Sequence, residues 1–301
     1  MIYPKCFTGV YPIYITSDSF VQPCCTVDSV ARDVEPVFYK HSLYNKSFQE
    51  IIESAEWNDW IDGLYETTMP ACTRMCSKKT PPRNSAAAQY SETSWDGQKR
   101  SGEVTDVQLE TSNRCTLACL YCARLKTNNL NKNDLPLEHI QDILKYRYLK
   151  SLHDCGNYGD PIFYKHYHEM LEMINASMIE LYNASIAATG RTDEWWDKTH
   201  GMWKELIESG INVRIHWGID GLENRSKQHR VHQNWQSIFK QMERSATYGV
   251  DACWRFIPMS FNEHQIDVCR KIAEDIGVKF YTHHSHRFSP DDPNLPKLRP
   301  T

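Results

Sequence analysis

The chain has 301 residues, of which 41% are hydrophobic and 12% aromatic, so it can form one domain of about 200 residues and a smaller one. Its formal net charge of −4 excludes a general basic surface and argues against duplex nucleic acid as a partner. No window approaches the roughly 18 apolar residues of a membrane span, and no basic stretch followed by an apolar run opens the chain. We therefore expect a cytoplasmic protein, in which eleven cysteines favour metal or redox chemistry over disulfides.

The first predicted elements are a hairpin and a helix. Residues 3–25 predict a short apolar hairpin with its turn at residues 17–19. Ser47 and Glu50 then predict a capping box that opens an amphipathic helix running towards Trp60.

Cysteines flank both of these elements. They are Cys6, Cys24, Cys25, Cys72 and Cys76. Four thiolates satisfy a zinc ion as well as an iron-sulfur cluster, so both kinds of site stay open here.

Residues 81–103 predict a linker, because they contain Pro81-Pro82 and many polar side chains. Beyond the linker, strands and helices alternate. Candidate strands are 104–109, 149–154, 185–189, 212–219, 252–259 and 278–282, and candidate helices are 137–148, 164–179, 193–209, 235–248 and 263–276. This alternation predicts an α/β fold with a parallel sheet and right-handed crossovers, although six strands are too few to close an eightfold barrel.

Three cysteines lie close together directly after the first of these strands. Cys115, Cys119 and Cys122 follow the spacing C-x3-C-x2-C, and no fourth ligand for a tetrahedral zinc site follows within the loop. Thiolates select zinc or iron-sulfur clusters, and three of them can hold three corners of a cubane while the fourth stays open. With the aromatic Tyr121 just before the last cysteine, the spacing resembles the signature of the radical S-adenosylmethionine (SAM) enzymes.

The resemblance implies a partial (β/α)6 barrel over residues 104–289, followed by a tail at 290–301. It also implies a 4Fe-4S cluster on Cys115, Cys119 and Cys122, with one iron open to the amino and carboxylate groups of SAM. Such enzymes take one electron from a donor such as flavodoxin or ferredoxin and release a 5′-deoxyadenosyl radical that abstracts a substrate hydrogen. The cofactor carries this chemistry, and the barrel orients and shields it.

Further cofactor-binding residues follow from the same resemblance. The segment Gly156, Asn157, Tyr158, Gly159 and Asp160 resembles the family's Gly-Gly-Glu-Pro segment, which binds the SAM amino group, although a plain turn is the alternative.

Later strand ends supply three more candidates. Thr189 ends a strand where relatives contact the ribose, and Asp220 ends another where it could meet SAM or substrate. Arg230 could bind a carboxylate bidentately or form a surface salt bridge. Asn262 and Glu263 are expected to cap the next helix.

The N-terminal cysteines resemble the twitch or SPASM-type auxiliary module of radical SAM proteins, here over residues 1–80. The resemblance implies a second 4Fe-4S cluster on Cys6, Cys24, Cys72 and Cys76. A module placed before the barrel resembles the layout of some bacteriophage-encoded radical SAM proteins. Two features depart from the pattern, since Ser19 replaces the hairpin glycine and the closing pair is C-x3-C.

Such modules in similar enzymes often accompany modification of peptides or proteins, so we expect a peptide or protein substrate. A small metabolite or nucleotide is the alternative, as is a non-enzymatic iron-sulfur electron carrier. Other residues have simpler interpretations: Cys155, Cys253 and Cys269 as packed thiols, Trp195 and Trp196 as packing under a loop, and the histidines 283, 284 and 286 as a surface cluster.

Overall fold

The computed structural model describes residues 13–25, 40–66, 104–126, 132–155, 157–175 and 178–283. Internal contacts divide the chain into two compact units. Unit 1 comprises Met1–Thr111 and Asp134–Asn157, and unit 2 comprises Ser112–Asn133 and Tyr158–Thr301. Within the described ranges, no helix has the length and apolar character needed to cross a membrane.

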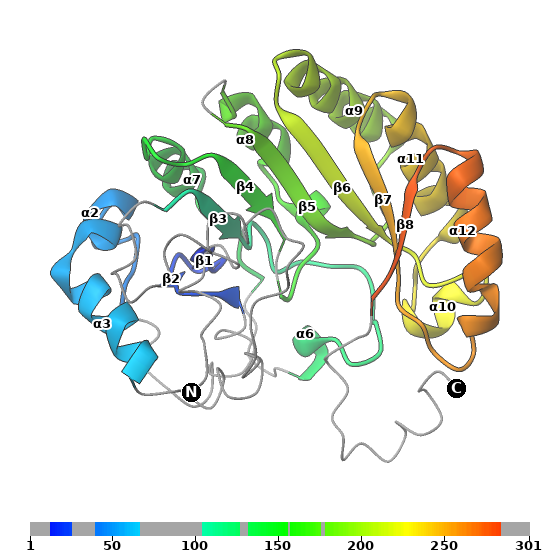
Figure 1. The fold of residues 1–301 in the computed structure, drawn as a ribbon, viewed down its shortest axis with the longest axis horizontal. Helices are drawn as coiled ribbons and strands as arrows, with labels where there is room; N and C mark the ends of the chain where they lie inside the picture. Colours follow the sequence, from blue (N-terminus) through cyan, green and yellow to red (C-terminus); the bar gives the residue numbers. More distant parts are fainter. Residues whose placement is uncertain are drawn as a thin grey trace. The chain divides into compact units, whose positions relative to one another are not determined.

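Unit 1 contains four strands in the order β2-β1-β3-β4 (Figure 1). They are β1 (Ile13–Ile15), β2 (Val21–Gln22), β3 (Asp106–Leu109) and β4 (Ser151–Asp154). Strand β2 returns antiparallel to β1, which confirms the predicted hairpin. Strands β1, β3 and β4 are parallel neighbours, with Ile13 opposite Val107 and Leu109 opposite Asp154.

The helices of unit 1 are α2 (Phe48–Glu53), α3 (Ala55–Glu66) and α7 (Leu137–Leu144). Ser47 and Glu50 form the predicted capping box at the start of α2. The next amide, that of Phe48, donates to the Asp142 carboxylate of α7 at 2.6 Å. The Phe48 ring meets Tyr146 edge-on, so α2 is held at its first turn by both a polar and an aromatic contact.

Unit 2 is built on four parallel strands in the order β5-β6-β7-β8. They are β5 (Glu180–Ile186), β6 (Asn212–Gly218), β7 (Asp251–Phe256) and β8 (Lys279–Thr282). Its helices are α6 (Ala123–Lys126), α8 (Tyr167–Met173), α9 (Asp193–Glu208), α10 (Ser226–His229), α11 (Trp235–Thr247) and α12 (Ile266–Asp275), with short 3-10 turns η2 (Pro161–Phe163) and η3 (Glu263–Gln265). Helices α9, α11 and α12 pack against β6, β7 and β8 in turn, as Figure 1 shows.

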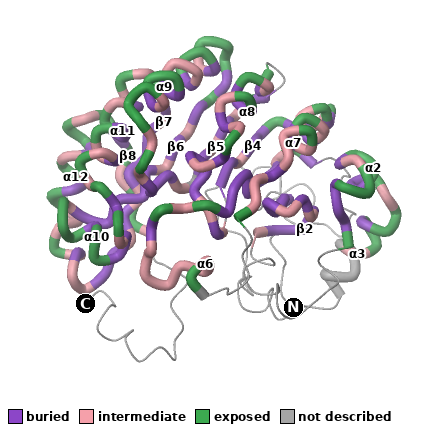
Figure 2. Tube along the Cα trace, turned by 180° about the vertical axis from the view of Figure 1, so that it is seen from behind, coloured by how far each residue is buried: buried purple, intermediate pink, exposed green. Residues whose placement is uncertain are grey.

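The two faces of this four-stranded sheet differ in character. Towards the helices, Trp217 of β6 packs against Trp196 and Trp203 of α9 with ring centroids 5.7 and 6.4 Å apart. All three indoles are buried, and Figure 2 shows β6 and β7 as largely buried strands.

Because side chains alternate along a strand, Arg214 belongs to the opposite face. Its guanidinium contacts Glu180 at 3.3 Å and Asp251 at 2.8 Å, and Asp251 also meets Lys279 at 2.7 Å. A ladder of charges therefore crosses this face from β5 to β8.

The α/β fold with a parallel-sheet core is confirmed, and each of the six predicted strands has a counterpart among β3 to β8. Two elements differ most from their predicted bounds. The predicted helix 164–179 ends at Met173, and the strand predicted at 185–189 begins at Glu180 and ends at Ile186. The segment 178–186 mixes apolar and polar residues and fits either element by its periodicity, so only pairing with β6 decides it.

Strand β1, predicted within a separate N-terminal module, pairs in parallel with β3. It thereby joins the sheet that carries β3 and β4. The linker 81–103 and the tail 290–301 lie outside the described residues, so the predicted domain boundaries stay a prediction.

Candidate active site

The three clustered cysteines lie on a loop of unit 2 that leads into α6. Their side chains are half-buried. The loop ends in a tight turn, because the Cys122 amide donates to Cys119 O at 3.1 Å and Tyr121 adopts φ 62°. The side chain of Arg124 in α6 donates back to the carbonyl of Leu117. Turn and side chain together keep the cysteine loop compact.

The surroundings of Cys115 shift the pKa of its thiol. Burial, followed by the negative charge of Asp160, raises the pKa of this thiol to about 12. The amide of Leu117 donates to its sulfur at 3.4 Å. Both effects disfavour a free thiolate at this position, and a bound metal centre would favour it.

The donor set of the loop fits an iron-sulfur cluster. Three thiols lie within eight residues, and a backbone N–H already points at one sulfur, as is usual for cluster ligands. Among the described residues, no three histidine, cysteine or acidic side chains converge in the geometry of a bound metal ion. The fit therefore rests on the chemistry of the donors and on their place in one loop.

The segment after β5 and the end of helix α10 hold this loop in place. The amides of Ala118 and Leu120 donate to the carbonyls of Val231 and His229, both at 3.0 Å. The hydroxyl of Thr116 donates to Thr189 O at 3.0 Å, just beyond the end of β5. The structure thus brings the predicted Thr189 to the cysteine loop.

Asp160 is buried beside the same strand end. One carboxylate oxygen accepts the amides of Ala187 and Ala188 at 2.8 and 2.7 Å, and the other accepts the amide of Ile162 at 3.4 Å. Burial raises its pKa, against the effect of these three amides. With its side chain occupied by backbone donors, Asp160 ties the predicted glycine segment to the end of β5, and its contact with SAM stays a prediction.

Gly159 is needed for a close approach of two backbones. A Cβ atom placed there would lie 1.7 Å from Ser112 O, so no larger residue fits without movement. Tyr158 is buried, and the side chain of Asn157, in unit 1, donates to Cys25 O at 2.6 Å. Gly156 lies outside the described residues.

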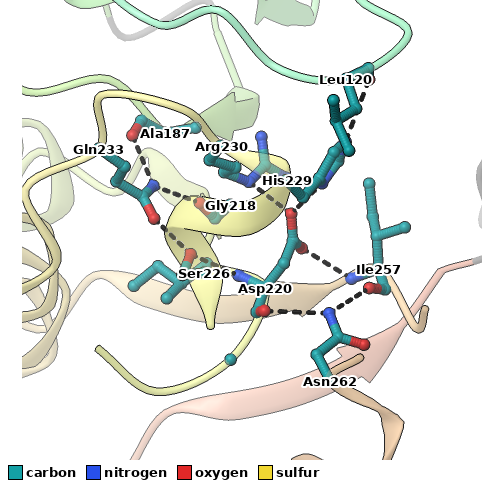
Figure 3. Close-up of polar contacts among 12 residues, drawn as sticks. Leu120, Ala187, Gly218, Asp220, Ser226, His229, Arg230, Gln233, Ile257 and Asn262 are labelled. Carbon is teal, nitrogen blue, oxygen red and sulfur yellow. Dashed lines mark hydrogen bonds and ion pairs between the residues drawn. The ribbon is translucent and has the colours of Figure 1, made fainter. Parts of the chain in front are cut away.

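Asp220 and Arg230 form a buried pair (Figure 3). Asp220 is fully buried, and its carboxylate meets the Arg230 Nε at 2.7 Å, His229 Nδ1 at 2.5 Å and the amide of Ile257 at 2.8 Å. Burial acts to raise the pKa of Asp220, but Arg230 and His229 outweigh it and lower that pKa. Of the two interpretations of Arg230, the salt bridge is observed, although inside the protein. This geometry favours a positioning role for Asp220, and the predicted contact of either residue with SAM stays a prediction.

Sequence reasoning did not single out two further polar residues around this pair, Ser226 and Gln233. Ser226 accepts the amide of Asp220 at 3.0 Å and donates to Gln233 at 2.5 Å, and Gln233 donates to the carbonyls of Ala187 and Gly218 (Figure 3). Their position after a strand end was the only signal, and polar residues there usually face solvent.

Asn262 was expected to cap the next helix, and that expectation is wrong. Its side chain accepts the amide of Met259 at 2.6 Å and donates to the carbonyls of Asp220 and Ile257, both at 3.0 Å. No side-chain cap bond reaches η3. Asn262 instead joins the turn after β7 to the buried Asp220 segment.

The remaining candidates from the sequence are either buried or half-buried in the described part of the chain, or lie outside it. Cys253 and Cys269 are buried, and burial raises their pKa to about 11 and about 12, as expected for packed thiols. Trp196 is buried, as expected for packing. Cys24 is buried and Cys25 half-buried. Those outside the described residues are Cys6, Cys72, Cys76, His284 and His286.

The family model of the radical SAM superfamily matches residues 109–275. This match spans more than half of the chain and includes the cysteine loop. The chain belongs to the radical SAM superfamily. Membership implies a 4Fe-4S cluster and SAM as its cofactors.

Two solved structures are similar to this chain at low sequence identity. SuiB of Streptococcus suis bound to SAM is 12% identical, with a TM-score of 0.51 over 82% of this chain and 54% of that chain. The structure of anSMEcpe with bound AdoMet is 16% identical, with a TM-score of 0.45 over 64% of this chain and 53% of that chain. The chain thus spans about half the length of these relatives. No curated protein matched it.

Proposed function

We propose that this chain binds a 4Fe-4S cluster through Cys115, Cys119 and Cys122 and uses it to cleave SAM reductively. When bound, the cluster and SAM supply one-electron cleavage to methionine and a 5′-deoxyadenosyl radical, which takes a hydrogen atom from the substrate. The main support is that the three-thiol loop is hydrogen-bonded to Thr189 after β5 and to the end of helix α10, all within the matched region. The chain's own residues hold and orient the loop and bury its surroundings.

Residues after the strand ends are the proposed SAM ligands. The segment 156–160 is proposed for the amino group, with its course fixed by Gly159 and by the anchoring of Asp160 on Ala187 and Ala188. Thr189 is proposed for the ribose, since it contacts the cysteine loop directly. Tyr121, Asp220 and Arg230 complete the proposed set. Arg230 is buried, and burial acts to lower its pKa, but Asp220, followed by Cys119 and Asp160, raises that pKa.

The test is formation of 5′-deoxyadenosine. Anaerobically reconstituted protein, given dithionite and SAM, should form 5′-deoxyadenosine and methionine in equal amounts. Cys119→Ala should abolish both, because the cluster loses one of its three protein ligands. Cys269→Ala is the matched control, since it removes a buried thiol outside the loop. Wild-type protein that contains the cluster but forms no 5′-deoxyadenosine would instead be an iron-sulfur carrier.

For the N-terminal segment we propose a second 4Fe-4S cluster on Cys6, Cys24, Cys72 and Cys76. The support is the order of cysteines around the hairpin β1–β2 and helices α2 and α3, and Cys24 directly follows that hairpin. Iron and sulfide are measured in a variant whose three loop cysteines are replaced by alanine. Zinc without sulfide in that variant would contradict the proposal and identify a structural zinc site.

The proposed substrate is a peptide or protein side chain, on the resemblance of this segment to auxiliary modules. Hydrogen transfer to the adenosyl radical identifies the donor. A deuterated cell extract, separated by size into macromolecules and small molecules, is supplied to the reconstituted enzyme, and 5′-deoxyadenosine is analysed by mass spectrometry. Deuterium should come from the macromolecular fraction, and deuterium only from the small molecules would favour a metabolite or nucleotide.

A further inference from the structure

His229 lies where the cysteine loop meets the buried network beneath it. It ends helix α10, and it is 5% exposed. Its ring joins two segments of unit 2, since Nδ1 is 2.5 Å from Asp220 Oδ2 and Nε2 is 3.3 Å from Leu120 O (Figure 3). Both ring nitrogens thus face oxygen acceptors, and Leu120 is 109 residues away in the sequence.

The side of His229 that faces the interior is rigidly held. Asp220 is fully buried, its backbone amide donates to Ser226, and its carbonyl accepts the side chain of Asn262. Its carboxylate also accepts the amide of Ile257. Satisfied buried polar networks of this kind specify one arrangement, because every broken bond leaves a buried group without water.

The side of His229 that faces the loop is backbone. The carbonyl of His229 accepts the amide of Leu120 at 3.0 Å, and the next carbonyl but one, that of Val231, accepts the amide of Ala118. Cys119 is therefore the residue between two anchored amides. The imidazole adds a contact to the Leu120 carbonyl, so Leu120, the residue that follows Cys119, is held at both its backbone amide and its backbone carbonyl.

We propose that His229 is a positioning residue that fixes the peptide around Cys119 against the buried Asp220. The inference rests on the proposed role of Cys119 as a cluster ligand, because only then does its position bear on the reaction. His229 itself touches neither cofactor nor substrate in this role. Leucine would fill much of the same volume but has no donor, whereas glutamine keeps one amide group that can reach a single partner.

The first test uses the protein without its cluster, so it is independent of the proposed chemistry. Hydrogen exchange of peptides covering residues 115–122 is compared between wild type and His229→Leu. We expect roughly tenfold faster exchange of the Leu120 amide in the variant. The amide keeps its backbone acceptor, but loss of the side-chain contact to the Leu120 carbonyl should let this segment open more often. His229→Gln should lie between the two. His264→Leu, an exposed histidine of unit 2, is the matched control and should leave the loop unchanged.

The second test measures iron and sulfide per chain after anaerobic reconstitution. His229→Leu should retain a smaller fraction of the cluster than wild type, and His229→Gln should recover part of it. Asp220→Asn should speed loop exchange as well, and combining it with His229→Leu should add little, because both act through one contact.

Three outcomes would overturn the inference. One is a folded His229→Leu variant whose loop exchange and iron content equal those of wild type. Another is faster exchange spread evenly over unit 2, which would make His229 a general stability residue. If His229→Leu does not fold, His229→Gln decides, and unchanged loop exchange there also contradicts the inference. If wild type binds no iron, yet its loop still exchanges more slowly than that of His229→Leu, the proposed function is rejected and the anchoring role of His229 stands.

Discussion

Two buried aspartates in unit 2 show how neighbours set the state of a carboxylate. Asp160 is surrounded by backbone amides, and burial raises its pKa. Asp220 has a guanidinium and an imidazole beside it, and its pKa is lowered despite burial. A lone buried carboxylate is costly, whereas one with a cationic partner stays ionised. Asp220 therefore stays ionised in its pair with Arg230. The ionised form of Asp160 is less favourable, because its pKa is raised.

The sharpest prediction for a single residue concerns Gly159. Gly159→Ala should lower the free energy of unfolding by about 3 kcal/mol, because the new Cβ would overlap the Ser112 carbonyl and the backbone must shift. Chemical denaturation measures the change.

Gly201→Ala is the matched control for this substitution. Gly201 lies within α9 and has open space around its Cβ position, so alanine there should raise stability by about 0.5–1 kcal/mol. Equal effects of the two substitutions would show that the close approach at Gly159 does not constrain the chain.

Among the elements, α2 depends on its first turn. The Ser47 hydroxyl accepts the amide of Glu50 at 3.3 Å, and the Glu50 carboxylate accepts the amide of Ser47 at 2.8 Å. A six-residue helix has few internal hydrogen bonds, so these end contacts matter more than in a long helix.

Ser47→Ala should therefore destabilise the protein by about 1 kcal/mol, measured by chemical denaturation. Ser47→Asp should lose less, since its carboxylate can accept the same amide and suits a helix N-terminus. Gln49→Ala, at an exposed position in the first turn of the same helix, serves as the control. A loss as large at Gln49 as at Ser47 would argue against the capping box as the cause.

At the scale of the whole molecule, the stability of unit 2 should depend on a buried histidine. His200 is fully buried, stacked against Trp196 and Tyr248 with centroids 5.8 and 5.4 Å apart. Burial, and then the charge of Arg244, lowers its pKa from 6.5 to about 4. It is therefore neutral in the folded protein at every pH near neutrality.

Between pH 6.5 and 4 the unfolded chain binds a proton at His200 that the folded protein does not. The free energy of unfolding should fall as pH falls through this window, by up to about 3 kcal/mol at its lower end. His200→Leu should remove this contribution and leave that of His216, whose pKa burial also lowers to about 4, whereas replacing the exposed His264 by leucine should leave the contribution of His200 in place. Parallel pH profiles of wild type and His200→Leu would show that His200 is protonated in the folded state.

The sequence alone determined the features that depend on local chemistry. The spacing of Cys115, Cys119 and Cys122 predicted a cluster loop and a family, and the family is confirmed. Periodicity predicted six strands and an α/β sheet, and Ser47 with Glu50 predicted a cap, both of which the structure contains. Such signals need only neighbours within a turn or a strand, so they can be read along the chain.

The tertiary structure alone decided which distant residues meet. Pairing of Ile13 with Val107 made β1 a neighbour of β3, and the contact of His229 with Leu120 linked two loops. Folding also buried Asp220 and paired it with Arg230 and His229. These outcomes depend on strand register and on which side of a loop is covered, and a polar side chain after a strand looks the same in sequence whether it ends in solvent or inside the protein.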